Sequence, residues 1–280
     1  YTHGEMLPAH MYPKLGDHPN LVGHYGDAWQ KQRGDFTRFP GAIIANTNCV
    51  VIPREAYRDR MFSINPVAVP GSQQIDEKDL SVVVEKALAL PHAEDDIVGE
   101  STIGFHHSVI ASKLDAVLDA VKAGDLRHVF LIGGCDGAEA GRNYFSDYAE
   151  AVPDDCLILT LGCGKYRIRN HDYGTILGLP RLMDMGQCND AYGAIMVASA
   201  LAEAVGATVN DLPLTLVVSW FEQKAVAVLQ TLLALGIKGI TIGPKPPAFV
   251  TPNVFAVMQE KWDLRLTGED AKAECAAALA

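Results

Sequence analysis

From residue 108 to the end of the chain, short apolar runs alternate with longer amphipathic segments, and this alternation limits the possible folds more than any other feature. Short apolar runs separated by helical segments are typical of parallel strands that are covered by helices on both faces. We therefore expect an α/β fold. The runs predict strands at Val129–Ile132, Leu157–Leu161, Arg181–Met185, Leu214–Val218 and Gly239–Ile242, and a further one at Asp263–Leu266.

The segments between these runs have helical spacing of their apolar residues. They predict helices at about 108–123, from about Ala138, at Asn189–Val205, at Gln223–Leu235 and at Pro252–Lys261. Gly124 follows the first of these segments, and glycine is a common C-cap because it adopts the left-handed conformation without strain.

Residues 1–107 are less regular, with strand-like runs at Ala42–Asn46 and Ser63–Val69 and one helix at about Glu77–Leu90. The segment Pro91–His107 has the composition of a loop, so we place a domain boundary there. The sequence thus predicts two Rossmann-like domains with parallel sheets flanked by helices, at residues 1–107 and 108–280. Because the chain starts inside a motif and without Met, we expect the first domain to be truncated at its N-terminus.

The charge balance excludes several classes of partner. The chain of 280 residues carries 34 acidic and 23 basic side chains, a net charge of −11. Binding to nucleic acid requires a basic surface, so we expect no nucleic-acid partner. No run approaches the roughly 20 apolar residues of a membrane span, and the first residues do not resemble a signal peptide. We expect a cytoplasmic protein that does not enter a membrane.

Four potential ligands follow four successive predicted strands. Cys135, Cys163 and Cys188 each follow a strand through one or two residues that include glycine, and Glu222 follows the strand Leu214–Val218. In parallel sheets, binding sites form at the carboxyl ends of the strands, where these side chains would converge. A helix N-terminus also favours the thiolate form of a nearby cysteine. The pattern predicts one site built from these four residues.

The cysteines are not all equivalent. The chain has six cysteines and no CxxC pair, and in a reducing cytosol such thiols are buried core residues, metal ligands or catalysts. A lone buried cysteine is more often a core residue, but three at equivalent strand ends are hard to explain in that way. Cys156 lies at the start of its strand, at the other edge of the sheet, and is interpreted as structural. Cys275 lies in an Ala-rich tail and is interpreted as incidental.

The donor types favour iron over zinc. A structural zinc site would normally show closely spaced pairs of Cys or His, whereas ligands from separate strand ends suit a larger object such as an iron–sulfur cluster. Lys224, two residues after Glu222, could supply a proton or a positive charge, although such a lysine is more often solvated. A redox thiol at Cys135 is an alternative. A phosphate-binding loop at Cys135 is a weaker one, because the spacing is not GxGxxG.

Several motifs resemble those of the hybrid cluster protein family, also called hydroxylamine reductases or prismane proteins, which is related to the nickel carbon monoxide dehydrogenases. The resemblance extends over essentially the whole chain. Its motifs are Tyr-Thr-His-Gly-Glu-Met-Leu-Pro-Ala-His, Asn-Thr-Asn-Cys, Ile-Gly-Gly-Cys-Asp-Gly, Leu-Gly-Cys-Gly-Lys-Tyr-Arg, Asp-Met-Gly-Gln-Cys-Asn-Asp-Ala-Tyr and Ser-Trp-Phe-Glu-Gln-Lys-Ala-Val-Ala-Val-Leu.

The resemblance implies a four-iron hybrid cluster of the 4Fe-2O-2S type. By motif, its ligands here are Glu5, Cys49, Cys135, Cys163, Cys188 and Glu222. Cys135 matches the cysteine that carries a persulfide in the family, and Lys224 matches a lysine beside the cluster. The family's histidine ligand and a second iron–sulfur cluster belong to sequence upstream of Tyr1. We therefore expect the 280-residue chain alone to assemble the hybrid cluster poorly and to be inactive.

The resemblance also implies an oxidoreductase that reduces hydroxylamine to ammonia and water, and in some members nitric oxide to nitrous oxide, in protection against nitrosative stress. Its partners would be a small nitrogen-oxide substrate and an electron-donor redox protein. Glu222 and Lys224 are the expected catalytic residues, as a movable ligand and a proton donor. Two alternatives remain open: a carbon monoxide dehydrogenase-like metallocluster enzyme, and a nitric oxide sensing or S-nitrosylating protein that acts through Cys135.

Overall fold

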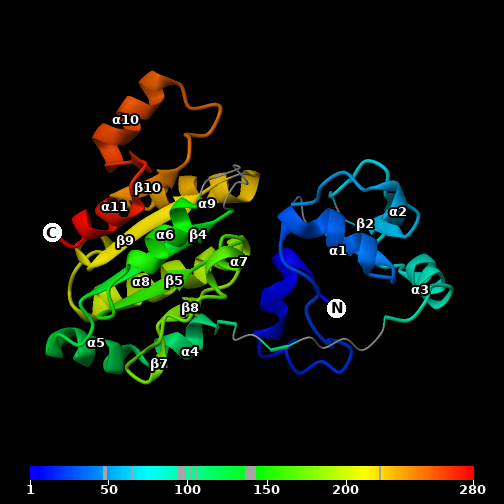
Figure 1. Cartoon of the computed structure of the whole chain (residues 1–280), viewed down its shortest axis with the longest axis horizontal. Coiled ribbons are helices and arrows are strands. Elements are labelled where there is room, and N and C mark those ends of the chain that lie inside the picture. The colour runs from blue at the N-terminus through cyan, green and yellow to red at the C-terminus, as the bar shows by residue number, and fades with distance from the viewer. Residues whose placement is uncertain are drawn as a thin grey trace. The chain divides into compact units, whose positions relative to one another are not determined.

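The computed structural model describes residues 1–46, 49–64, 66–93, 99–100, 103–104, 106–135, 143–220 and 222–280. The chain divides into two compact units (Figure 1). Unit 1 consists of Tyr1–Met6 and Val22–Thr102, and unit 2 of Leu7–Leu21 and Ile103–Ala280. The domain boundary expected at residue 107 stays a prediction. The two units differ from it in assigning Leu7–Leu21 to the same unit as the C-terminal part.

Unit 1 contains a small parallel sheet in the order β1-β2-β3. Its strands are β1 (Ile43–Ala45), β2 (Met61–Ser63) and β3 (Gln73–Gln74), and its helices are α1 (Gln32–Arg38), α2 (Glu55–Arg58) and α3 (Ser81–Leu88). The strand expected at Ser63–Val69 was wrong, because β2 ends at Ser63. Pro66, which has no N–H for a strand ladder, lies within the expected range. The core of the unit contains Tyr57 and Met61, which are almost completely buried.

Unit 2 contains a six-stranded sheet in the order β11-β10-β9-β4-β5-β8, and every pair of neighbours is parallel. The strands are β4 (His128–Gly134), β5 (Cys156–Thr160), β8 (Leu182–Asp184), β9 (Leu214–Ser219), β10 (Ile240–Gly243) and β11 (Arg265–Leu266). From β4 the chain first adds strands on one side and then, from β9, on the other side. This is the doubly wound Rossmann order, and its direction reverses between β4 and β9. The predicted α/β fold with parallel sheets is confirmed.

Helices connect these strands and cover both faces of the sheet (Figure 1). They are α4 (His107–Ala111), α5 (Leu114–Ala123), α6 (Tyr144–Ala151), α7 (Lys165–Ile168), α8 (Ala191–Ala204), α9 (Gln223–Ala234), α10 (Pro252–Trp262) and α11 (Ala271–Ala277). A short antiparallel pair, β6 (Thr175–Ile176) and β7 (Leu179–Pro180), lies between α7 and β8.

The single helix expected at 108–123 is divided into α4 and α5, because the backbone at Lys113 leaves the helical region (φ −111°, ψ 6°). Helix α5 ends at Gly124 in the left-handed conformation (φ 82°), as predicted. The expected helix start at Ala138 lies outside the described residues, which resume just before α6.

The apolar strand residues alternate between two helix layers. Phe130 and Ile158 face α6 and α11 in one core cluster, whereas Leu131 and Leu216 lie on the other face, toward α8 and α9. Cys275, interpreted above as incidental, belongs to the first cluster and is only 1% exposed. Helix α11 is therefore a packed part of unit 2.

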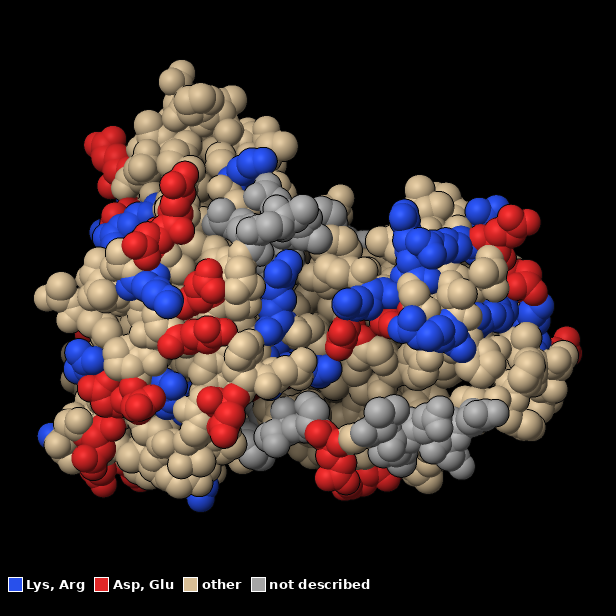
Figure 2. Space-filling model, in the orientation of Figure 1, with Lys and Arg blue, Asp and Glu red and all other residues tan. Residues whose placement is uncertain are grey.

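The lengths of the helices and the distribution of charged side chains can be compared with the expectations for membrane and nucleic-acid partners. None of the helices in the part of the chain that the structure describes is long and apolar enough to cross a membrane. On the face of unit 2 seen in Figure 2, basic side chains lie among acidic ones. In the same view Lys and Arg side chains lie close together on unit 1, so the expectation of no nucleic-acid partner stays a prediction.

Candidate functional site

The loops after four neighbouring strands of unit 2 meet at one edge of the sheet. Cys135 follows β4 directly, Cys163 follows β5, Cys188 follows β8, and Glu222 lies between β9 and α9. All four strands are parallel, so these residues follow the same, carboxyl ends. The point between β4 and β9, where the strand order reverses, is where open α/β sheets bind their ligands.

Backbone hydrogen bonds hold these loops against one another. The loops after the four strands therefore meet through main-chain contacts as well as through the order of the strands. Because each bond joins a different pair of loops, the segments around the three cysteines and the end of β9 form one continuous rim. The bonds run from Cys135 N–H to the Ser219 carbonyl (3.2 Å), from Gly164 N–H to the Gly134 carbonyl (2.8 Å) and from Gly162 N–H to the Gly186 carbonyl (2.9 Å).

Two glycines allow this close approach of the main chain. Gly134 has φ +98°, and a Cβ placed there would lie 1.9 Å from the carbonyl oxygen of Ser219. Gly162 has φ +85°, and its added Cβ would lie 2.7 Å from the Gly134 carbonyl oxygen. Glycine is required at both positions, because any side chain would both strain the backbone and separate the loops.

Gly134→Ala should lower the free energy of unfolding by at least about 2 kcal/mol, because strain at positive φ adds to a main-chain clash. Urea-induced unfolding followed by circular dichroism measures this loss. Gly124→Ala is the matched control: Gly124 also has positive φ (+82°), but an added Cβ there meets no atom within 4 Å. Its expected loss is about 1 kcal/mol. Equal losses would contradict a special role for the contact between Gly134 and Ser219.

The sulfur atoms of this rim lie in buried side chains. Cys135, Cys163 and Cys188 are 3%, 4% and 6% exposed. The side-chain amide of Gln187, itself fully buried, donates to the Cys163 sulfur at 3.5 Å. An N–H donor to a buried sulfur stabilises the thiolate. Gln187 was not among the predicted site residues, because its position before Cys188 gives no signal that its side chain turns back toward Cys163.

The Glu222 carboxylate is the side chain of the rim whose environment best fits a bound cation. Both carboxylate oxygens are buried, and neither accepts a hydrogen bond within the described residues. A buried carboxylate without partners is strongly unfavourable, so native proteins pair such groups or bind a cation there. Glu222 is the N-cap residue of α9, and Lys224 lies in the first turn of that helix. A bound cation would satisfy the carboxylate of Glu222.

The donor set is suited to a polynuclear centre. No three His, Cys, Asp or Glu side chains of the described residues lie close enough together to hold one metal ion. Cysteine thiolates are the usual ligands of iron–sulfur clusters. Three thiols and one carboxylate, from four loops of one rim, could hold such an object.

Glu5 and Cys49, the other two expected ligands, belong to unit 1. Both are 9% exposed. The loop of Cys49 is held by the buried side chain of Gln32, whose amide donates to the Cys49 carbonyl at 2.5 Å and accepts from Val51 N–H at 3.1 Å. Their role as ligands stays a prediction.

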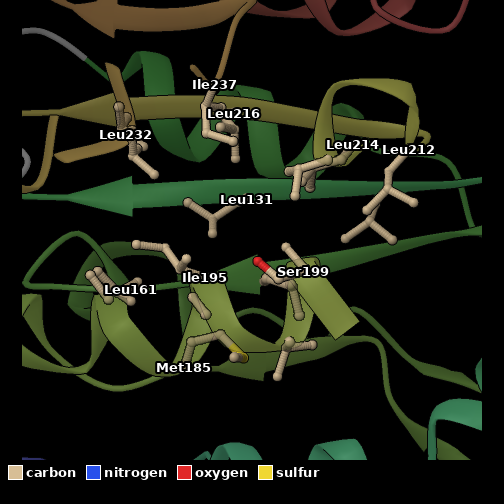
Figure 3. A pocket seen from close by; sticks show the side chains of 18 of the residues that line it. Leu131, Leu161, Met185, Ile195, Ser199, Leu212, Leu214, Leu216, Leu232 and Ile237 are labelled. Atoms are coloured by element: carbon tan, nitrogen blue, oxygen red, sulfur yellow. The ribbon is translucent and has the colours of Figure 1, made fainter. Parts of the chain in front are cut away.

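An apolar cavity of about 430 Å³ adjoins the rim in unit 2. Figure 3 shows side chains of the sheet, including Leu131 and Leu216, opposite Ile195 and Ser199 of α8. At one end the cavity is lined by Cys188, together with residues at the ends of β4 and β9. The cavity therefore gives this edge of the sheet an apolar space in which a small neutral molecule could be held.

The two remaining cysteines of unit 2 lie in a different environment. Cys156 starts β5 and Cys275 lies in α11, both within the core cluster of Phe130. Burial raises the pKa of each thiol to about 11, and a hydrogen bond to Asp155 adds to the effect at Cys156. These thiols are therefore protonated core residues, as interpreted for Cys156.

Known proteins share both the sequence and the fold. A profile described as the Prismane/CO dehydrogenase family matches residues 1–273. Proteins named "Hydroxylamine reductase" are similar to the chain. One from Moorella thermoacetica is 57% identical and aligns over 95% of this chain and 62% of its own length. Another, from Burkholderia ambifaria strain MC40-6, is 53% identical over 100% of this chain and 50% of its own length.

The chain thus spans about half the length of the curated relatives it matches. Among solved structures, carbon monoxide dehydrogenase IV from Carboxydothermus hydrogenoformans is similar with a TM-score of 0.69 and 15% identity. The match covers 91% of this chain and 50% of that one. At this identity the likeness supports the fold alone.

Proposed function

The chain belongs to the Prismane/CO dehydrogenase family, and on this basis we propose that it is the hybrid-cluster part of an oxidoreductase that reduces hydroxylamine to ammonia and water. The observation that carries the proposal is the buried Glu222 carboxylate, without a partner among the described residues, at the rim that bears three buried cysteines. Thiolates and carboxylates together suit iron, with the hard oxygen donors leaving positions open to an N–O group.

The proposed cofactor is an iron–sulfur–oxygen cluster of the 4Fe-2O-2S type. Cys135, Cys163, Cys188 and Glu222 of the rim would hold it, and the family motifs add Glu5 and Cys49 as further proposed ligands. When bound, the cluster would supply electrons and an open iron position. A histidine and a second iron–sulfur cluster in the rest of the protein belong to the same proposal, as does a redox protein that delivers electrons.

Side chains of this chain would donate protons to the substrate and control its access to the cluster. The reaction is NH2OH + 2 e⁻ + 2 H⁺ → NH3 + H2O, so a proton donor is needed beside the N–O group. We assign Lys224, in the first turn of α9, to donate a proton, and Glu222 to shift as a ligand when substrate binds. The apolar cavity lined at one end by Cys188 would suit a weakly polar diatomic such as nitric oxide, the second proposed substrate.

The test uses the full-length protein that contains this chain, loaded anaerobically with iron and sulfide. A reduced viologen dye supplies the electrons, and ammonia is measured as hydroxylamine is consumed. Iron without nickel, together with ammonia formation, is expected. Nickel with iron and oxidation of carbon monoxide would favour the carbon monoxide dehydrogenase alternative. Little metal and nitrosation of Cys135 would favour a nitric oxide sensor, and an iron-loaded protein that forms no ammonia would contradict the proposal.

Gln187→Leu should lower the midpoint potential of the loaded cluster, because a hydrogen bond to the Cys163 sulfur stabilises the reduced, more negative state. Loss of one hydrogen bond of about 1 kcal/mol corresponds to about 40 mV for one electron. Spectroscopic redox titration measures the change. Gln259→Leu, on the exposed surface of α10, is the control and should leave the potential unchanged. An unshifted potential in Gln187→Leu would show that this contact does not tune the cluster.

A further inference from the structure

Lys165 is buried in an unusual way for a lysine. It lies two residues after Cys163, begins the short helix α7, and is only 1% exposed. Lysine is almost never fully buried unless it is paired, because removing the ammonium from water is costly. A fully buried lysine this close to a cysteine of the rim therefore needs a specific explanation.

The ammonium group of Lys165 contacts the end of β8 and the loop that follows it. Its ammonium forms an ion pair with Oδ1 of Asp184 and donates to the Gly186 carbonyl at 2.7 Å. The same Asp184 oxygen accepts from Gly186 N–H at 2.8 Å. Asp184 is the last residue of β8, and Gly186 lies two residues before Cys188. The side chain of Lys165 thus connects the loop of Cys163 to the loop of Cys188.

Two other contacts join the same pair of loops. Gly162 N–H donates to the Gly186 carbonyl at 2.9 Å, so that carbonyl accepts hydrogen bonds from both sides of Cys163. The Gln187 amide donates to the Cys163 sulfur. Of these links, the pair of Lys165 and Asp184 is the only one formed between two opposite charges, and such bonds are shorter and stronger than neutral ones.

We propose that Lys165, through Asp184 and Gly186, is a positioning residue that fixes the loop of Cys163 relative to the loop of Cys188, so that both sulfurs are in place before iron binds. This inference rests on the proposed function, because it takes Cys163 and Cys188 as cluster ligands. Groups that orient metal ligands change metal affinity even though they do not touch the metal.

A purely structural role makes a different prediction. Replacing a buried ion pair by apolar side chains of similar size is often neutral or stabilising, whereas removing one partner leaves a buried charge and is destabilising. Faster iron loss in Lys165→Met alone could therefore come either from the lost connection between the loops or from a destabilised fold. The double variant Lys165→Met/Asp184→Leu removes both charges, so it can keep the fold stable while it removes the connection between the loops.

The experiment compares wild type, Lys165→Met and the double variant in the full-length, iron-loaded protein. The rate of iron loss to a chelator and the electron paramagnetic resonance spectrum at matched iron content are the readouts, with thermal unfolding in parallel. We expect both variants to lose iron about 10-fold to 100-fold faster, in line with the loss of other ligand-orienting groups, and to show a changed spectrum.

Arg181→Met is the matched control. Arg181 is also a buried base (5% exposed), but it donates to the carbonyls of Tyr173 and Pro153, away from the rim cysteines. It should lower the unfolding temperature and leave the iron-loss rate and the spectrum unchanged. If the double variant keeps the wild-type rate and spectrum, or if Arg181→Met accelerates iron loss to the same extent, the positioning role of Lys165 is wrong.

Failure of this inference differs from failure of the proposed function. If wild type binds iron and forms ammonia while the double variant retains its cluster normally, only the inference about Lys165 fails. If wild type takes up no iron, the assignment of Cys163 and Cys188 as ligands fails, and the positioning role fails with it. An iron-loaded wild type that forms no ammonia contradicts the function, while the iron-loss rates still decide the role of Lys165.

Discussion

Glu222→Gln should reduce hydroxylamine turnover of the loaded full-length protein by at least about 100-fold, because it removes a proposed cluster ligand, and even groups that only orient ligands are worth up to about 100-fold. Glutamine keeps the shape of the side chain but removes the negative charge that would bind iron. Both carboxylate oxygens of Glu222 are buried, so solvent cannot readily replace them. Steady-state rates at matched iron content measure the effect.

Glu222→Gln should also stabilise the metal-free protein against unfolding. Without a cation the carboxylate has no partner among the described residues, and burying a neutral amide costs less than burying a charge. Glu222→Gln is therefore expected to raise the free energy of unfolding of the metal-free protein by about 1–3 kcal/mol.

Glu203→Gln, at an exposed position on α8, is the control and should change the unfolding free energy by less than about 0.5 kcal/mol. Near-normal turnover of Glu222→Gln with an intact cluster would refute the catalytic role of Glu222.

The sequence was sufficient to predict the sheet of unit 2 because its strands are apolar on both faces. Phe130 and Leu131 are adjacent in β4 and face opposite helix layers, so the strand is read as a continuous apolar run. Because neighbouring strands in such folds are parallel, residues that follow the strands fall at one edge. The rim that bears Cys135, Cys163 and Glu222 follows from that rule.

The contacts that hold the rim together could not be predicted, because they depend on how side chains fold back between loops. Lys165 was recognised only as part of a motif, and neither its burial nor its pairing with Asp184 has a local sequence signature. Gln32 reaches the Cys49 carbonyl from 17 positions earlier in the chain. In unit 1 the strands are only two or three residues long, which is too short for a periodic pattern, and the expected strand at Ser63–Val69 was misplaced for this reason.

Alanine substitutions of the cysteines should separate ligands from core residues. Cys135→Ala, Cys163→Ala and Cys188→Ala should each strongly reduce the iron bound per chain and the visible absorption of the cluster, since each removes a proposed thiolate ligand from the rim. Cys156→Ala and Cys275→Ala are matched controls, because these cysteines are equally buried but lie in the core cluster. They should retain iron and lose about 0.5–3 kcal/mol of stability.

Thiol reactivity in the metal-free protein tests separately whether Cys156 and Cys275 are protonated core residues. With pKa values of about 11, only about one in a thousand of the Cys156 and Cys275 thiols is ionised at pH 8, and the thiolate is the reactive form. Both side chains are also almost completely buried, so iodoacetamide should modify these two cysteines slowly at pH 8. Mass spectrometry locates the modified residues.

Normal iron content in all three rim variants, or iron loss in Cys156→Ala equal to that in Cys163→Ala, would show that these strand-end thiols are not the ligands.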